Sequence, residues 1–230
     1  MCVLMLSPRT TVKTEDIIGF GSLLSETSAR HTFPQLHDFH FVRVHGYRRV
    51  MTHPASIFFQ RGIAVAATKE FSSLSTEAHE GAHFVASVFQ IDGLDLEAYV
   101  EREEEFDFMC ADYTGLDDPS ETGTGLMCAR STDAAYLARW GQSIMDERYG
   151  AYGITSVWDA WHPGSGILPC PVYLRHCMLA ATAQGSRVLD SFLDETFLSD
   201  RVTTVRQHLH ARPDIMETEP PAHLIGRYSG

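Results

Sequence analysis

The stretch Asp16-Ile17-Ile18-Gly19-Phe20-Gly21-Ser22-Leu23-Leu24 is typical of a short buried strand that ends in a glycine turn. Glycines at such a turn let the backbone approach a ligand closely, and the amides that follow point outward, where they bind an anionic or carbonyl group. The alternative is a tight turn without a ligand. A dinucleotide fingerprint is excluded, because it needs a third glycine where Leu24 stands and a βαβ pattern that does not follow.

Beyond this turn, strands are expected mainly in the first half of the chain and helices in the second. The predicted strands cover residues 39–50, with a bulge or bend at Gly46, residues 84–91, with apolar residues on both faces, and residues 169–174. The predicted helices cover residues 92–106, 133–149 with a cap at 131–133, 177–194, and 201–210 with Asp200 as N-cap. Residues 117–124 are predicted to form a surface loop, and residues 213–230 an extended strap or a frayed tail.

A carboxylate interrupts the apolar face of the helix predicted over residues 92–106. Leu96, Tyr99 and Val100 share that face, and position 103 continues it at helical spacing, but the residue there is Glu103. Burial would raise its pKa toward neutrality, which suits a general base or acid. On a helical wheel of this segment, Glu101, Glu104 and Glu105 fall on other faces and are expected to point to water. The alternative is a helix that ends before residue 103, with all four glutamates forming a solvated acidic cap.

Two further segments combine aromatic and basic residues, and each is a candidate pocket wall. Arg48 lies in one of them, on the strand predicted over residues 39–50, and Tyr149 follows the helix predicted to end near it. Packing and surface charge are the plainer interpretation of both. The chain contains 12 histidines, but neither an HExxH motif nor a second ligand cluster accompanies residues 37–40, so no metal site is predicted. Ser22 does not lie in a GxSxG nucleophile elbow.

The composition is that of an ordinary globular protein with an acidic balance. Eighteen Lys and Arg against 30 Asp and Glu give a net charge of −12, which disfavours nucleic acids and anionic membranes as partners. No apolar run approaches the length of a membrane span. Five cysteines without a CxxC motif predict free thiols in a reducing compartment, the cytoplasm or an organelle stroma or matrix, where a targeting segment would have been removed. The sequence is also compatible with an oligomer.

Four short motifs stand together in the order and spacing of a known family. They are Gly19-Phe20-Gly21-Ser22-Leu23-Leu24, Gly46-Tyr47-Arg48, Ala86-Ser87-Val88-Phe89-Gln90-Ile91 and Tyr99-Val100-Glu101-Arg102-Glu103. Residues 17–108 thereby resemble the γ-glutamylcyclotransferase-like superfamily. The resemblance implies an α+β fold, a small mixed β-barrel of about five or six strands with surrounding helices.

The resemblance also implies a site and a reaction. The turn residues that would hold the γ-glutamyl group are Phe20, Gly21, Ser22, Leu23 and Leu24, and Glu103 would serve as base and acid while the α-amine of the substrate attacks its own γ-carbonyl. The products would be 5-oxoproline and a released amine or amino acid. Such an intramolecular attack requires no cofactor or metal. Family members often carry Tyr where Phe20 stands, and an aromatic hydroxyl commonly follows the glutamate, whereas Phe106 and Phe108 occur here.

These observations together predict an N-terminal tail at 1–15, a cyclotransferase-like barrel core at 16–130, and a mostly helical C-terminal extension at 131–230 packed on the core. The predicted function is a cofactor-free γ-glutamyl cyclotransferase acting on a small molecule. Two alternatives stay open. One keeps the fold but changes the small-acid substrate and uses lyase or hydrolase chemistry. The other is a non-catalytic binding or regulatory module.

Overall fold

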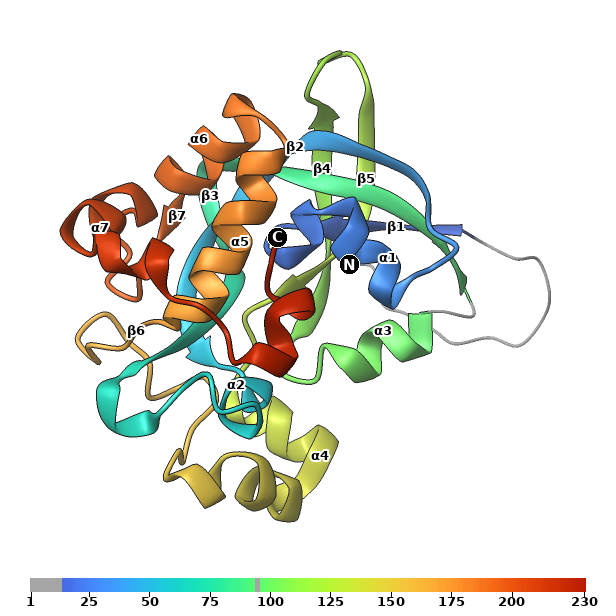
Figure 1. The fold of residues 1–230 in the computed structure, drawn as a ribbon. Coiled ribbons are helices and arrows are strands. Elements are labelled where there is room, and N and C mark those ends of the chain that lie inside the picture. Colours follow the sequence, from blue (N-terminus) through green and yellow to red (C-terminus); the bar gives the residue numbers. More distant parts are fainter. Residues whose placement is uncertain (1–13, 94–95) are drawn as a thin grey trace.

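A closed β-barrel of five strands forms the centre of the molecule (Figure 1). The computed structural model describes residues 14–93 and 96–230; Cys2 and most of the predicted N-terminal tail lie outside them. The strands are β1 (Thr14–Gly19), β2 (His37–Pro54), β3 (Glu70–Asp92), β4 (Asp107–Gly115) and β5 (Thr122–Ala129). They pair in the order β3-β1-β5-β4-β2, and the β2–β3 pairing closes the ring. The β1–β5 pair is parallel and the others are antiparallel, which confirms the predicted mixed barrel.

The long β2 and β3 strands form the antiparallel pair that carries most of the barrel. Their register shifts between His45 and Tyr47, at Gly46, whose φ is +77°. A left-handed residue at a bulge favours glycine, so the bulge predicted at this position is confirmed. Residues 84–91 lie within β3, and Phe84, Val88 and Phe89 are fully buried, as expected for a strand with apolar residues on both faces.

Helices and two short strands cover the outside of the barrel (Figure 1). The helices are α1 (Glu26–Thr32), α2 (Ser56–Gln60), α3 (Leu96–Arg102), α4 (Asp133–Arg148), α5 (Pro171–Ala183), α6 (Ser186–Asp194) and α7 (Val205–Ala211). The 3₁₀-helices are η1 (Ser22–Leu24), η2 (Ala66–Thr68), η4 (Gly150–Tyr152), η5 (Pro213–Glu217) and η6 (Ala222–Arg227). Strands β6 (Leu168–Pro169) and β7 (Thr196–Phe197) pair in parallel with β3 and β2. Within the described residues, no helix is long and apolar enough to cross a membrane.

Capping and turn patterns in the sequence predicted the start of one helix correctly and the starts of two others wrongly. Helix α4 begins as predicted, with the Thr132 side chain accepting from the amide of Ala135, although Gly141 kinks it. The strand predicted over 169–174 is wrong beyond β6, because Pro171 starts α5 at a position where proline suits a helix. Helix α7 begins four residues later than predicted, behind a Thr204 capping box, while Asp200 caps the preceding turn.

From residue 177 onward, the chain forms shorter elements than its hydrophobic periodicity predicts. The single helix expected over 177–194 is wrong, because Gly185 adopts a φ of +91° and separates α5 from α6. The tail at 213–230 is neither extended nor frayed. It forms η5 and η6, and its Ile215 and Tyr228 side chains are buried at 1% and 4% exposure. These buried apolar side chains pack the tail against the rest of the molecule, although its sequence pattern is typical of an unpacked segment.

We expect Gly19→Ala to lower the free energy of unfolding by about 1–3 kcal/mol, the usual range for overpacking a well-packed interior. A Cβ atom at Gly19 would lie 2.6 Å from both Leu23 Cβ and Ser87 Oγ. Urea denaturation measures the change. Gly226→Ala is the matched control, because a Cβ atom there meets nothing within 4 Å. Equal stabilities of the two variants would contradict the close packing of the turn.

Candidate active site

A cavity of about 740 Å³ opens at one end of the barrel. Its walls come from the glycine turn, from α2, from the end of α3 and the residues after it, from the end of α4, from α5, and from η6 in the tail. Figure 1 shows η6, drawn in red, lying between α3 and α5. Segments that are far apart in the sequence, including three from beyond residue 130, therefore meet around one space.

The glycine turn forms one wall of this cavity. Strand β1 ends at Gly19, the chain turns at Gly21, and η1 follows, with the amide of Leu24 donating to the Gly21 carbonyl at 3.0 Å. The amides of Ser22 and Leu23 lie at the start of this 3₁₀-helix, before its first donor Leu24, so no carbonyl of the helix accepts from them. A Cβ atom on Gly21 would approach the Tyr173 hydroxyl to 2.9 Å, so any larger residue here would displace that side chain of α5.

The five turn residues do not all face the same way. Phe20, Gly21, Ser22 and Leu23 line the cavity, whereas Leu24 is fully buried in the hydrophobic core and does not line it. Leu24 therefore anchors the turn from behind.

Glu103 lines the same cavity as the turn. Helix α3 ends at Arg102, but the Glu103 amide still donates to the Tyr99 carbonyl at 3.0 Å, which continues the helical course by one residue. The Glu103 side chain is 17% exposed and lies 3.2 Å from Arg102 Nε. Burial raises its pKa, while the nearby Arg102 and Arg227 partly oppose that rise.

The next two glutamates were expected to point to water, and that expectation is wrong. Glu104 and Glu105 both line the cavity. Glu104 forms an ion pair with Arg148 and accepts from Ser56 Oγ at 2.8 Å. The helical wheel stops applying after Glu103, because the chain turns there and β4 begins at Asp107.

Glu105 is the most buried of these carboxylates, with 8% exposure. Its Oε1 accepts from the Tyr149 hydroxyl at 2.8 Å and from the Ser56 amide at 3.2 Å. Burial raises its pKa to about 7. No pattern around Glu105 in the sequence marks this position, since its partners come from α2 and from the end of α4.

Tyr149 and Arg48, the two other candidate residues, lie outside the cavity wall. Tyr149 is fully buried behind it, with its hydroxyl on Glu105, so it acts on the cavity through that side chain. Arg48 donates to Glu77 Oε1 through Nε at 2.8 Å and Nη2 at 2.6 Å. Arg201 binds the same carboxylate, so Arg48 belongs to a structural ion-pair group elsewhere on β2 and β3.

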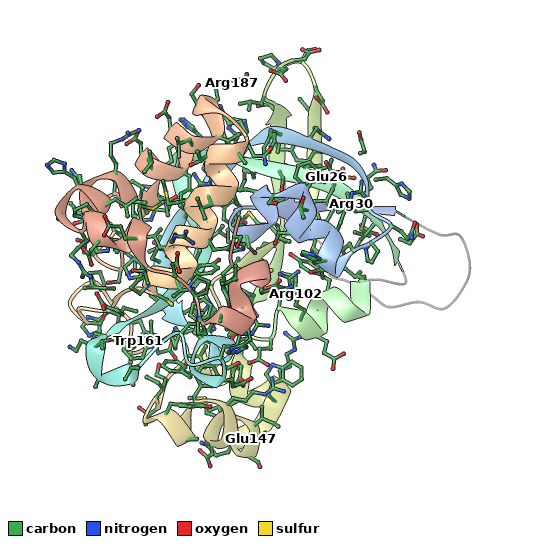
Figure 2. The ribbon with its side chains drawn as sticks, viewed as in Figure 1. Glu26, Arg30, Arg102, Glu147, Trp161 and Arg187 are labelled. Atoms are coloured by element: carbon green, nitrogen blue, oxygen red, sulfur yellow. The ribbon has the colours of Figure 1, made fainter. Side chains whose placement is uncertain are left out.

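Three arginines that sequence reasoning missed gather on the side of the cavity formed by α2, α3 and η6: Arg61, Arg102 and Arg227. Arg61 Nη1 donates to the Tyr228 hydroxyl at 2.9 Å. Figure 2 labels Arg102, which also donates to Thr32 Oγ1. Burial and the charges of Arg102 and Arg61 lower the pKa of Arg227. Among the described residues, no carboxylate forms an ion pair with Arg61 or Arg227, so this side can accept an anion.

His53 on β2 is another cavity residue that sequence reasoning did not identify. It is fully buried, stacks on Trp158 with ring centroids 4.3 Å apart, and meets Phe106 edge-on. Burial lowers its pKa to about 3, so the imidazole is neutral at physiological pH. Within residues 14–93 and 96–230, no group of three His, Cys, Asp or Glu side chains is arranged to hold a metal ion.

Comparison with known proteins finds solved structures whose folds are similar to that of this chain. No protein-family model matches the chain, and neither does any curated protein. Its fold is similar to that of γ-glutamyl cyclotransferases. One is the yeast γ-glutamyl cyclotransferase specific to glutathione, with 13% identity over 94% of this chain and 96% of that one, and a TM-score of 0.47.

Two further solved structures are similar over about half of the chain. A protein described as a γ-glutamyl cyclotransferase has 10% identity over 52% of this chain and 68% of its own, with a TM-score of 0.41. An uncharacterized protein from Homo sapiens has 11% identity over 51% and 67%, with a TM-score of 0.42. At such identities and TM-scores the likeness says nothing of the reaction.

Proposed function

We propose that this chain is a γ-glutamyl cyclotransferase that works without a cofactor and uses Glu103 as its general base. The observation that carries the proposal is the position of Glu103. This carboxylate, with a pKa raised by burial, lines one cavity together with the amide-bearing turn at Gly21, Ser22 and Leu23. A base with a raised pKa beside backbone amides suits an acyl transfer within one substrate molecule.

In the proposed reaction, the α-amine nitrogen of the substrate attacks its own γ-carbonyl carbon. The new C–N bond closes a five-membered ring, and the amine proton passes to the Glu103 carboxylate. The γ-amide C–N bond then breaks, the leaving nitrogen takes up a proton, and 5-oxoproline and an amine or amino acid are released. Backbone amides at Ser22 and Leu23 are suited to the oxygen on which charge develops.

The cavity also offers a binding site for the substrate's charge. The net charge of the chain is −12, so a γ-glutamyl compound with its carboxylate needs local cations. Arg61 and Arg227 supply them at the cavity wall. In this proposal Leu24 and Tyr149 support the site from behind, and Arg48 takes no part.

The proposal is tested by measuring 5-oxoproline release from glutathione, γ-glutamyl amino acids and γ-glutamyl amines. We expect turnover of at least one member of this panel. If the folded protein turned over none of them, the cyclotransferase proposal would be wrong. Calorimetric titration with the same compounds would then separate a binding module, which takes up ligand without turnover, from an enzyme for another small acid.

Arg227→Gln is expected to raise KM by about 10-fold or more, since a hydrogen bond to a charged group contributes about 1.5–3 kcal/mol. The kcat should change little, because the substrate carboxylate is bound in both ground and transition states. Steady-state kinetics on the best panel substrate measures both. The control is Arg187→Gln on α6. Figure 2 shows Arg187 at the end of the view opposite Glu147, a residue of the cavity wall. An unchanged KM would exclude Arg227 from carboxylate binding.

A further inference from the structure

The cavity holds a second carboxylic acid whose surroundings differ from those of Glu103. Glu103 lies beside the cation of Arg102, which favours its ionised form. Glu105 receives only neutral donors, the Tyr149 hydroxyl, the Ser56 amide and its own backbone amide. Two carboxyl groups in one site with environments that separate their protonation are the usual arrangement for a base and an acid.

The contacts of Glu105 leave one of its oxygen atoms available for a proton. Tyr149 and Ser56 both bind Oε1, at 2.8 Å and 3.2 Å, and no side chain that the structure describes hydrogen-bonds to Oε2. Because Oε1 accepts, the proton of the neutral acid resides on Oε2. Glu105 also lines the cavity and is close enough to Glu103 for the charge of Glu103 to oppose its ionisation.

We propose that Glu105 is a catalytic acid that protonates the leaving nitrogen while Glu103 takes the proton of the attacking amine. This inference rests on the proposed cyclotransferase function, and it divides between two residues the base and acid roles that the family resemblance gives to Glu103 alone. Tyr149 is a positioning residue, since it holds Oε1 and thereby directs Oε2.

The proton balance of this step closes. The α-amine nitrogen bonds to the γ-carbon and gives a proton to ionised Glu103. The γ-amide C–N bond breaks, its electron pair stays on nitrogen, and nitrogen receives the proton of Glu105. After the step Glu103 is neutral and Glu105 is ionised, so one proton must return from Glu103 to Glu105, directly or through solvent, before the next turnover.

The groups that face Glu105 set the pH at which it loses its proton. Burial keeps its pKa near 7, above the usual value for glutamic acid, against the hydrogen bonds from Tyr149 and Ser56. The charged and titratable neighbours are Glu103, Glu104, Arg148, Tyr149, Tyr136 and Cys128. Activity that needs neutral Glu105 is therefore present below about pH 7 and lost as the pH rises through that value.

Leaving-group chemistry tests the proposal. A γ-glutamyl alkylamide leaves as a strongly basic amine whose nitrogen must be protonated as the C–N bond breaks. In γ-glutamyl p-nitroanilide the nitrophenyl ring delocalises the charge on the leaving nitrogen, so its departure depends much less on an acid and the nitrogen can take its proton from solvent afterwards. We expect Glu105→Gln to lower kcat/KM for the alkylamide by about 100-fold or more, in the range of general acid catalysis, and that for the anilide by less than about 10-fold. Glu103→Gln should lower both. Glu101→Gln, on the exposed side of α3, is the matched control.

A second measurement needs no variant at Glu105. In the wild-type protein, kcat/KM for the alkylamide should fall above about pH 7, and the ratio of alkylamide to anilide rates should fall with it. Ionisation of the substrate amine affects both compounds and cancels in that ratio. In Tyr149→Phe the fall should move to higher pH, because removing a donor to the carboxylate raises the pKa of Glu105.

Three outcomes separate the hypotheses. Equal losses on both compounds in Glu105→Gln, or a rate ratio that does not change with pH, would overturn the assignment of Glu105 as the acid. If the wild-type protein turned over neither compound, nor any other γ-glutamyl substrate, the proposed function itself would fail. If Glu103→Gln abolished turnover while Glu105→Gln lowered it equally for the alkylamide and the anilide, the chain would be a cyclotransferase in which Glu105 is not the acid.

Discussion

Glu103→Gln is expected to lower kcat for 5-oxoproline release by about 100-fold or more, which is the usual contribution of a general base. Glutamine keeps the shape of the side chain but cannot take up the amine proton. The side chain stays in place beside Arg102 and the turn, so the substrate should still bind with a similar dissociation constant. Single-turnover kinetics and calorimetric titration measure the two quantities separately.

The control for this variant is again Glu101→Gln. It removes the same charge two residues earlier, from the last turn of α3, on a side chain that faces solvent, so its kcat should match that of the wild type. Thermal unfolding of both variants shows whether they are folded. A folded Glu103→Gln protein with at least a third of the wild-type kcat would rule out Glu103 as the base.

The second large effect concerns stability. Trp158→Ala is expected to lower the free energy of unfolding by about 3–5 kcal/mol, as is usual when a large buried aromatic is truncated. Trp158 is fully buried, stacks on His53, and donates from its indole N–H to the Glu105 carbonyl at 2.7 Å. It thus connects the segment after residue 130 to the loop that carries the cavity's carboxylates.

Urea denaturation followed by circular dichroism measures this change. Trp158→Phe is the matched control, because it keeps an aromatic ring but removes the indole donor, and its effect should be smaller. We propose that residues 131–230 are an extension packed on the barrel core, so both variants should still unfold in one transition. A loss below about 1 kcal/mol in Trp158→Ala, well short of the range for such truncations, would contradict this role of the extension.

Several features of the fold were predictable because they depend on neighbouring residues. The bulge at Gly46 and the cap at Thr132 follow from local geometry, and the strand–turn pattern before Ser22 follows from adjacent apolar residues and two glycines. The predicted helix over 92–106 was too long. Its described part ends at Arg102, since periodicity marks a buried face but not the residue at which tertiary contacts turn the chain.

The misplaced helices have a similar cause. Asp200 and Thr204 are both good capping residues, and only the packing of the folded chain selects between them. Gly185 breaks the helix predicted over 177–194 because it adopts a left-handed conformation, which its sequence neighbours do not specify.

By itself, the sequence determined that Glu103 continues an apolar helical face and that a glycine turn follows an early buried strand. Both are short-range properties of the chain. Only the tertiary structure decided that these two features share a cavity with Glu105 and Arg227. Burial in the folded chain raises the pKa of Glu105, and its hydrogen-bond donors Ser56 and Tyr149, which oppose that rise, are distant in sequence. The cations come from separate segments that the closed barrel brings together.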